Sequence, residues 1–373
     1  MNKKMLVAVF TASILMLSAV AVFAKSWHGK DHDRDERDLA GAVYAMTNAS
    51  TDNEVVIFDR DDEGLLTKAG SISTGGLGSG GGLDPLGSQG SLVLSTDHRW
   101  LLAVNAGSNE ISVFRVLPKG LKLADKVSSG GTFPVSLTVF HNLVYVLNAG
   151  TSPNITGFYL SHRGQLIPLD DSTRFLVSGG LAQVGFDPEG EMLVVTDRAN
   201  NEILVYTVGR KGLPGMNPVV SPSNGLVPFG FIFDERGHLL VSEAGSGAVS
   251  SYKILHDGTL KAISPSVANG QAATCWIAGN KRGDVFTANT GSQTLSAYDV
   301  KVRKGELTLL NATAGVADRP IDLSITANGR FLYALDPGNG TVHIFRVKRD
   351  GSLNDLGAVD GGLSIFAQGI AAR

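Results

Sequence analysis

The 373-residue chain contains a single cysteine, Cys275, so no disulfide can form within it. A domain of this size without disulfides is held together by a large hydrophobic core, which many packed apolar strands can supply. Cys275 lies in the apolar run CWIAG, where we expect a small buried hydrophobic residue rather than a reactive thiol.

The chain also lacks a basic cluster. Its formal net charge is −3, and loss of an N-terminal segment carrying Lys3 and Lys4 would change it to −5. Nucleic acid binding requires a concentrated positive surface, so we exclude nucleic acid as a partner.

Residues 1–24 have a basic start, a long apolar run, and small residues at Val22 and Ala24. This pattern is typical of a secretory signal peptide cleaved after Ala24, and it predicts a periplasmic or extracellular protein. The alternative is an uncleaved anchor, because the run is long enough to cross a bilayer. After removal of the signal we expect no membrane association and a monomer.

Residues 25–40 carry crowded charges of both signs and one aromatic residue, which predicts a flexible leader. His28 and His32 could hold a divalent cation weakly, but solvated histidines are the expected reading. We therefore predict no metal site and no cofactor.

The rest of the chain is built from a repeated unit. The segment NAGSNEISVF returns as EAGSGAVSSY, NTGSQTLSAY and DPGNGTVHIF, with steps of 43 to 57 residues between the seven copies. The copies begin at Asn48, Asn105, Asn148, Asp197, Glu243, Asn289 and Asp336.

Each copy has an aromatic residue nine or ten positions later, followed by a glycine turn. A full unit contains four short apolar runs separated by Gly, Asn, Asp or Pro, as expected for strands joined by tight turns. Seven such units predict an all-β fold, a seven-bladed β-propeller with four-stranded blades over residues 41–373. A long β-sandwich is the alternative, but it does not require seven similar units.

The unit's first residue is expected to be a turn residue. An Asn or Asp side chain there can accept hydrogen bonds from backbone amides two residues on, and the nearby Gly can adopt the positive φ of a short hairpin. The last residues, FAQGIAAR, match an inner strand such as LAQVGFDP, and the first copy lacks one. The C-terminal strand is therefore predicted to close the ring.

The phrases STDHRWLLAVNAGSNEISVFRV and TANGRFLYALDPGNGTVHIFRV resemble the seven-bladed lactonase-type propellers, which include 6-phosphogluconolactonase and the carboxymuconate-cyclizing enzyme. The resemblance covers residues 41–373 and implies the propeller fold and lactone hydrolysis. Enzymes of that family carry Pro-His-Pro-His before an inner strand of a middle blade, followed by an Asp-Leu-Gly turn. In the matching stretch, residues 178–206, both histidines are missing and only Asp197 corresponds to that signature.

The ligand face of a propeller carries the connections between blades and the loops between second and third strands. The structured histidines fall outside this face, so no catalytic residue is assigned. The candidate ligand-binding residues there are Gln183, Asp197, Arg198, Glu243, Arg319, Asp322 and Gln368. Glu243 stands out because it replaces the usual Asn or Asp of the turn. The alternative is a solvated channel mouth with turn-capping carboxylates.

The stretch STGGLGSGGGLDPLGSQG, residues 73–90, lacks the lysine and helix pattern of a phosphate-binding loop and is expected to be a flexible connection between blades. Two functions follow from these observations. The first is binding of an unknown small molecule or protein at the channel mouth. The second is lactone hydrolysis by carboxylates and arginines.

Overall fold

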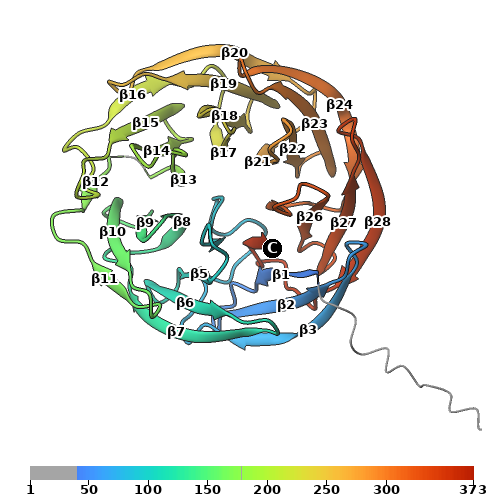
Figure 1. Cartoon of the computed structure of the whole chain (residues 1–373), viewed down its shortest axis with the longest axis horizontal. Helices are drawn as coiled ribbons and strands as arrows, with labels where there is room; N and C mark the ends of the chain where they lie inside the picture. Colours follow the sequence, from blue (N-terminus) through green and yellow to red (C-terminus); the bar gives the residue numbers. More distant parts are fainter. Residues whose placement is uncertain (1–39, 178) are drawn as a thin grey trace, which may run out of the picture. The chain divides into compact units, whose positions relative to one another are not determined.

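Seven antiparallel sheets are arranged in a ring (Figure 1), as the repeat predicts. The computed structural model describes residues 40–177 and 179–373. The predicted signal peptide, and the leader up to residue 39, lie outside these residues. Ala40 already belongs to the first blade, because its amide donates to the carbonyl of Arg60 at 3.0 Å. Within the described residues, no helix is long and apolar enough to cross a membrane.

We number the blades by their order along the chain, and each blade has an inner, second, third and outer strand. The inner strands are β29 (Ile370–Ala372), β4 (Leu92–Leu94), β8 (Pro134–Phe140), β13 (Leu181–Phe186), β17 (Pro228–Phe233), β21 (Thr274–Gly279) and β25 (Leu323–Ile325), in blades 1 to 7. The second strands are β1 (Gly41–Met46), β5 (Trp100–Asn105), β9 (Leu143–Asn148), β14 (Met192–Asp197), β18 (His238–Glu243), β22 (Asp284–Asn289) and β26 (Phe331–Asp336).

The third strands are β2 (Glu54–Arg60), β6 (Glu110–Val116), β10 (Asn154–Leu160), β15 (Glu202–Thr207), β19 (Ala248–Ile254), β23 (Thr294–Lys301) and β27 (Thr341–Val347). The outer strands are β3 (Leu66–Ser73), β7 (Leu121–Ser128), β16 (Val219–Pro222), β20 (Leu260–Ala268), β24 (Glu306–Val316) and β28 (Leu353–Asp360). In blade 3 the outer position is divided between β11 (Leu166–Pro168) and β12 (Arg174–Phe175), which both pair with β10. Pro168 ends β11 because proline has no amide hydrogen to continue the ladder.

The predicted closure of the ring is confirmed. Strand β29 pairs antiparallel with β1, with Val43 opposite Ala372 and Ala45 opposite Ile370. Blade 1 is therefore formed by both ends of the propeller. This pairing satisfies the edge of β1, which would otherwise expose a row of unpaired backbone groups.

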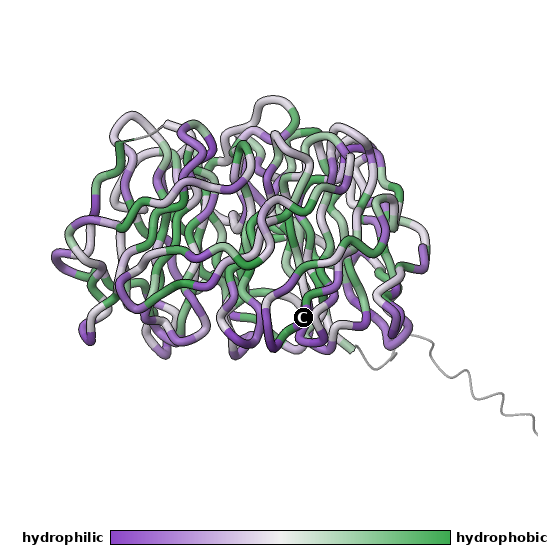
Figure 2. Tube along the Cα trace, turned by 90° about the horizontal axis from the view of Figure 1, so that it is seen from above, coloured by the Kyte–Doolittle hydropathy of each residue, from purple (hydrophilic) through white to green (hydrophobic). Residues whose placement is uncertain are grey.

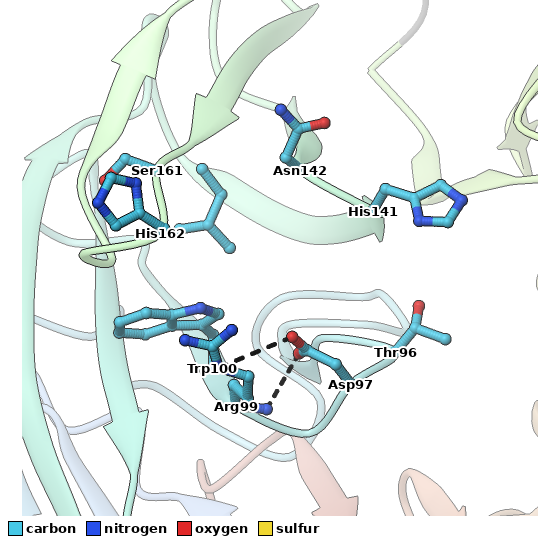
Figure 3. Close-up of a pocket in the computed structure, with 9 residues that line it drawn as sticks. Thr96, Asp97, Arg99, Trp100, His141, Asn142, Ser161 and His162 are labelled. Atoms are coloured by element: carbon cyan, nitrogen blue, oxygen red, sulfur yellow. Dashed lines mark hydrogen bonds and ion pairs between the residues drawn. The ribbon is translucent and has the colours of Figure 1, made fainter.

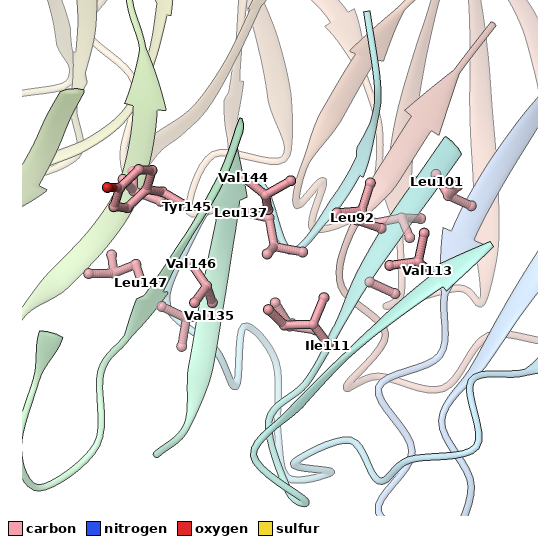
Figure 4. Close-up of a cluster of buried hydrophobic side chains, with 14 of the residues drawn as sticks. Leu92, Leu101, Ile111, Val113, Val135, Leu137, Val144, Tyr145, Val146 and Leu147 are labelled. Atoms are coloured by element: carbon pink, nitrogen blue, oxygen red, sulfur yellow. The ribbon is translucent and has the colours of Figure 1, made fainter. Parts of the chain in front are cut away.

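The core lies between neighbouring blades. Figure 4 shows one such region, where Leu92, Ile111 and Val113 of blade 2 gather with Leu137 and Val144 of blade 3. The predicted third-strand aromatics are all buried, at Phe58, Phe114, Phe158, Tyr206, Tyr252, Tyr298 and Phe345. Figure 2 shows the hydrophobic residues concentrated in the strands and hydrophilic residues in many of the loops.

The glycine after each third strand is also confirmed as a turn residue. These seven glycines have φ angles between 72° and 87°, a region that favours glycine, at Gly64, Gly120, Gly164, Gly212, Gly258, Gly305 and Gly351.

The role predicted for the unit's first residue is wrong for the copy at Asn105. Its side-chain oxygen accepts from Asn53 Nδ2 of blade 1 at 3.0 Å, so it links two blades instead of capping its own turn. Positive φ occurs at the end of the loop, at Asn109 (61°), and not at Gly107. Gly107 is small for another reason, because a Cβ there would lie 2.2 Å from the carbonyl oxygen of Gly78.

Deleting residues 366–373 should remove β29 and leave the inner edge of blade 1 unpaired. Each lost hydrogen bond contributes about 1 kcal/mol, and the apolar contacts of Ile370 and Ala371 are lost as well. We expect insoluble or protease-sensitive protein without a cooperative thermal transition. Deletion of Arg373 alone keeps the paired residues of β29 and is the matched control. An unchanged thermal midpoint in the longer deletion would contradict the closure.

Candidate functional site

The inner strands surround a central channel that contains a cavity of about 480 Å³. We call the face with the inter-blade connections the channel mouth, and the face with the remaining turns the far face. At the far-face end the cavity is lined by apolar residues that include Leu94, Phe186 and Phe233. Its other end is polar and includes Gln183 and Asp322.

Residues 84–90, which we call the mouth segment, fill the channel mouth. They belong to the connection between β3 and β4, and Figure 1 shows the chain that leads into β4 inside the ring. Ser88 Oγ donates to the Val135 carbonyl of blade 3 at 2.8 Å, and the Gln89 amide donates to the Ala182 carbonyl of blade 4 at 3.2 Å. The predicted flexible connection is therefore wrong for this part, because these residues are bonded to inner strands of different blades.

Blade 6 holds the mouth segment from another side. Trp276 Nε1 donates to the Ser88 carbonyl at 2.9 Å. The side-chain amide of Gln89 donates to the Ile277 carbonyl at 3.0 Å and accepts from the Ile277 amide at 2.9 Å. Through these two bonds the Gln89 side chain continues the backbone hydrogen bonding of β21 into the channel. The channel mouth is therefore occupied by protein, whereas the alternative interpretation of the sequence expected a solvated opening.

Gln368, a predicted site residue, supports the mouth segment from blade 1. Its Nε2 donates to the Ser88 carbonyl at 2.8 Å and to Asp84 Oδ1 at 2.9 Å. Its Oε1 accepts from the Leu86 amide at 3.1 Å. The side chain is fully buried, and all of these contacts are to the protein itself.

The side chain of Arg198 packs against the mouth segment. Gly87 has a φ of 57°, and a Cβ there would lie 2.2 Å from Arg198 Nη2, so only glycine lets the guanidinium pack this closely. The guanidinium carbon is also 5.6 Å from the centre of the Phe229 ring. Burial raises the pKa of Asp84 to about 7, against the opposing effect of the nearby Arg198 charge and the Gln368 hydrogen bond.

Asp322 is buried at the polar end of the cavity. Its carboxylate accepts from the amide of Leu323 at 2.9 Å and from that of Ile370 at 3.3 Å. Burial raises the pKa of Asp322 to about 7, the two backbone bonds oppose this, and the charge of Asp84 adds to it. A carboxyl group with such a pKa can exchange a proton near neutral pH.

Gln183 has a structural contact similar to that of Gln89. Its side-chain amide donates to the Phe231 carbonyl at 3.0 Å and accepts from the Phe231 amide at 2.7 Å, which joins the inner strands of blades 4 and 5. Gln183 also lines the cavity. The recurrence of glutamine at inner-strand starts was visible in the sequence, although its pairing partners were not.

Glu243 is fully buried away from the cavity lining. Its carboxylate accepts from Ser250 Oγ at 2.5 Å, from Ser266 Oγ at 2.8 Å and from the Gly225 amide at 2.8 Å. The carboxylate of this longer side chain thus bonds both its own blade and the connection that contains Gly225. The change from Asn or Asp to Glu therefore has a structural cause, and the sequence signal did not require a ligand.

Asp197 and Arg319 complete the predicted set. Asp197 Oδ1 accepts from the amides of Ala199 at 3.0 Å and Asn200 at 3.2 Å, as predicted for a turn-capping carboxylate. Arg319 is exposed and has a φ of 55°. The structure therefore gathers Arg198, Asp322 and Gln368 around the mouth segment, while the network of Glu243 belongs to blade 5.

The sequence did not point to Asp84. Gln368 bonds both Asp84 and the Ser88 carbonyl, and Trp276 donates to the same carbonyl. Asp84 occurs in a glycine-rich stretch, and its side-chain partners Arg198 and Gln368 are more than 100 residues away, so no local pattern identifies them. Cys275 is buried as predicted, and burial raises the pKa of its thiol. No group of three or more His, Cys, Asp and Glu residues suited to a metal ion occurs in the described part of the chain.

The far-face placement of the turn histidines is confirmed. His98 and His141 lie between inner and second strands, His162 and His256 lie between third and outer strands, and His238 is the first residue of β18 at the far-face end of that strand. His343 lies within β27.

Comparison with known proteins identifies a family and several structures of similar fold. The model of the family described as lactonase, 7-bladed β-propeller, matches residues 44–175 and 241–361. The 6-phosphogluconolactonase of Bacillus subtilis (strain 168) is 28% identical over 116 residues, which are 30% of this chain and 33% of that protein. This match thus spans about a third of the relative's length.

Two solved structures show the same fold. A putative 6-phosphogluconolactonase from Bacteroides fragilis NCTC 9343 has 18% identity and a TM-score of 0.72, with 91% of this chain and 100% of that chain covered. The periplasmic gluconolactonase of Pseudomonas aeruginosa has 14% identity and a TM-score of 0.69, with 89% and 98% covered.

The raised pKa of Asp322 predicts a dependence of stability on pH. The neutral form is favoured in the folded state, so its stabilisation is fully present below pH 3.8 and is lost as the pH rises through about 7. Between pH 4 and 8 we expect the free energy of unfolding to fall by up to about 4 kcal/mol from this group. Asp322→Asn should flatten this dependence in thermal melts.

Asp97→Asn is the matched control. The pKa of Asp97 lies below its usual value, so this carboxyl group stays ionised between pH 4 and 8. Burial alone would raise that pKa, but the Ser95 hydroxyl and the Arg99 amide outweigh it. An equal slope in wild type and Asp322→Asn would contradict the assignment.

Proposed function

Because the chain belongs to the lactonase family of seven-bladed β-propellers, we propose that it uses the family fold to bind a small molecule in the central channel, without hydrolysing a lactone. The observation that supports this most is the mouth segment. It fills the channel mouth and leaves a cavity of about 480 Å³ in the central channel. The ligand then enters from the far face, which differs from the channel-mouth binding expected from the sequence.

Lactone hydrolysis makes demands that this arrangement meets poorly. A base must contact the attacking water, and a cation or hydrogen-bond donor must face the oxyanion that develops. Arg198 is packed against Gly87 and Phe229, and the carboxylate of Glu243 is occupied by donors of its own blade. Arg198 and Glu243, two of the groups that the hydrolase hypothesis assigned to chemistry, thus have packing roles.

The channel also indicates the kind of ligand. Most of the surface that lines the cavity is polar, and Leu94, Phe186 and Phe233 add a smaller apolar part at the far-face end. Asp322 provides one hydrogen-bonding group at the closed end. The neutral carboxyl can donate a hydrogen bond and the ionised carboxylate can accept one. A small ring that carries an amide or hydroxyl group suits this mixed lining.

Lactone hydrolysis remains the second candidate, and one observation favours it. Asp84 and Asp322 both have pKa values of about 7, and Asp84 lies near the Arg198 charge. Carboxyl groups with such values suit general base catalysis at neutral pH. For this activity the mouth segment would have to leave the channel and admit the lactone.

We further propose that the chain is exported. The N-terminal pattern of residues 1–24 supports this, and a similar fold occurs in a protein whose name describes it as periplasmic. The mass of the mature protein tests it, because cleavage after Ala24 leaves Lys25 as the first residue.

The hydrolase alternative is tested by ring opening of gluconolactone and 6-phosphogluconolactone at pH 7. We expect no rate above the spontaneous one. Turnover that falls by about 10² to 10⁴ in both Asp322→Asn and Arg198→Gln would instead establish hydrolysis, since removal of a general base has that effect. Arg163→Gln, a change at an exposed arginine of a far-face turn, is the control.

Channel binding is tested separately with cyclohexanecarboxamide as the probe. A molecule that binds only the folded state raises the thermal midpoint as its concentration increases. We expect such a rise in wild type and none in Val139→Trp, which places a large side chain at the channel wall. The absence of a rise in wild type, or an equal rise in the variant, would contradict binding in the channel.

A further inference from the structure

A groove of about 500 Å³ lies on the far face, across the ends of blades 5, 6 and 7, and we call it the far-face groove. Four residues line both this groove and the channel cavity, namely Pro188, Ile232, Phe233 and Gly279. Figure 3 shows another far-face cavity, of about 710 Å³ between blades 2 and 3, which shares no lining residue with the channel. The cavity of about 790 Å³ between blades 4 and 5 shares none either. The far-face groove therefore adjoins the proposed binding site, unlike these two cavities.

The surface of the far-face groove is mostly apolar, in contrast to that of the channel cavity. Ile232 and Phe233 at the end of β17, and Ile325 at the end of β25, are half-buried, so part of each side chain remains accessible. Gly279 makes room for Ile232, because a Cβ at Gly279 would lie 2.6 Å from Ile232 Cδ1. The groove thus presents accessible apolar surface next to the far-face end of the channel.

Each of the three charged residues that line the far-face groove has a partner within the protein. Asp234 Oδ1 accepts from the His238 amide at 2.9 Å, and Asp234 Oδ2 lies 2.7 Å from His238 Nδ1. Lys281 Nζ lies 3.1 Å from Glu235 Oε1, which joins the turns of blades 5 and 6. A ligand in the groove therefore needs no charge of its own, and its favourable contacts are with the apolar side chains.

We propose that the far-face groove binds the hydrocarbon chain of an amphipathic ligand whose polar ring occupies the channel. This inference rests on the proposed function, because the channel holds the ring. The amide or hydroxyl of the ring bonds Asp322 in the polar part of the channel. The chain leaves the channel at its far-face end beside Phe233 and covers Ile232 and Ile325. The ligand class is therefore a small polar ring that carries an alkyl chain.

The test compares two probes by isothermal titration of the purified full chain. Cyclohexanecarboxamide fills the channel alone, and N-butylcyclohexanecarboxamide has the same ring and amide with four added carbons. We expect the butyl compound to bind wild type at least about tenfold more tightly, since each methylene buried against apolar surface adds to the affinity.

Two variants locate this gain. Ala327 is exposed and lines the groove but not the channel, so Ala327→Trp should reduce the ratio of the two affinities to about one and leave cyclohexanecarboxamide binding unchanged. Ile325→Thr keeps a β-branched side chain in β25 but removes apolar surface, and should lower the ratio severalfold. Thr96→Trp is the matched control, because Thr96 is exposed at the corresponding turn position of blade 2 and lines neither the groove nor the channel.

The outcomes separate this inference from the proposed function. Equal affinity of wild type for the two probes would overturn the groove and leave channel binding intact. Absence of binding by both probes would overturn both proposals. A tenfold gain that persists in Ala327→Trp and Ile325→Thr would place the chain elsewhere, and an equal loss in Thr96→Trp would show an effect unrelated to the groove. Either of these last two results would also overturn the inference.

Discussion

The hydrogen bonds made by the last eight residues connect the ring, the mouth segment and the buried acid. The amide of Gln368 donates to the Met46 carbonyl, and Ile370 continues the pairing with Ala45 that closes blade 1. The side chain of Gln368 then binds Asp84, Leu86 and Ser88, while the Ile370 amide donates to Asp322. One short segment therefore maintains both the closed ring and the closed channel mouth.

This arrangement explains why the polar residues of the channel mouth bind other parts of the protein. A buried polar group needs a partner, and the side-chain amides of Gln89, Gln183 and Gln368 find backbone partners on other blades. The carboxyl groups of Asp84 and Asp322 are less well compensated, and their raised pKa values reflect this. The neutral acid is tolerated in such a position where the charged form is costly.

The sequence predicted the features that depend on local patterns. Seven units, buried aromatics such as Phe114, glycine turns such as Gly120 and closure by the C-terminal strand all follow from repeated spacing, and all are confirmed. The mouth segment could not be predicted in this way. Gln89 and Ile277 are 188 residues apart, and glycine-rich composition by itself indicates only conformational freedom.

Glu243 is a second case in which contacts between residues distant in the sequence could not be predicted. The sequence identified it correctly as an unusual residue, but the reason is the position of Ser266 and Gly225, which only the folded chain brings near. A departure from a repeat therefore locates a change in local contacts without telling whether those contacts are to a ligand.

The central claim is that the mouth segment is a fixed part of the propeller, and amide hydrogen exchange measures this directly. The amides of Leu86 and Gln89 donate to Gln368 and Ala182, so they should exchange as slowly as those of the inner strands. The exposed glycines Gly81 and Gly82, a few residues earlier, should exchange rapidly. Exchange of Leu86 and Gln89 as fast as that of Gly81 and Gly82 would contradict the account and leave the channel mouth open to a substrate.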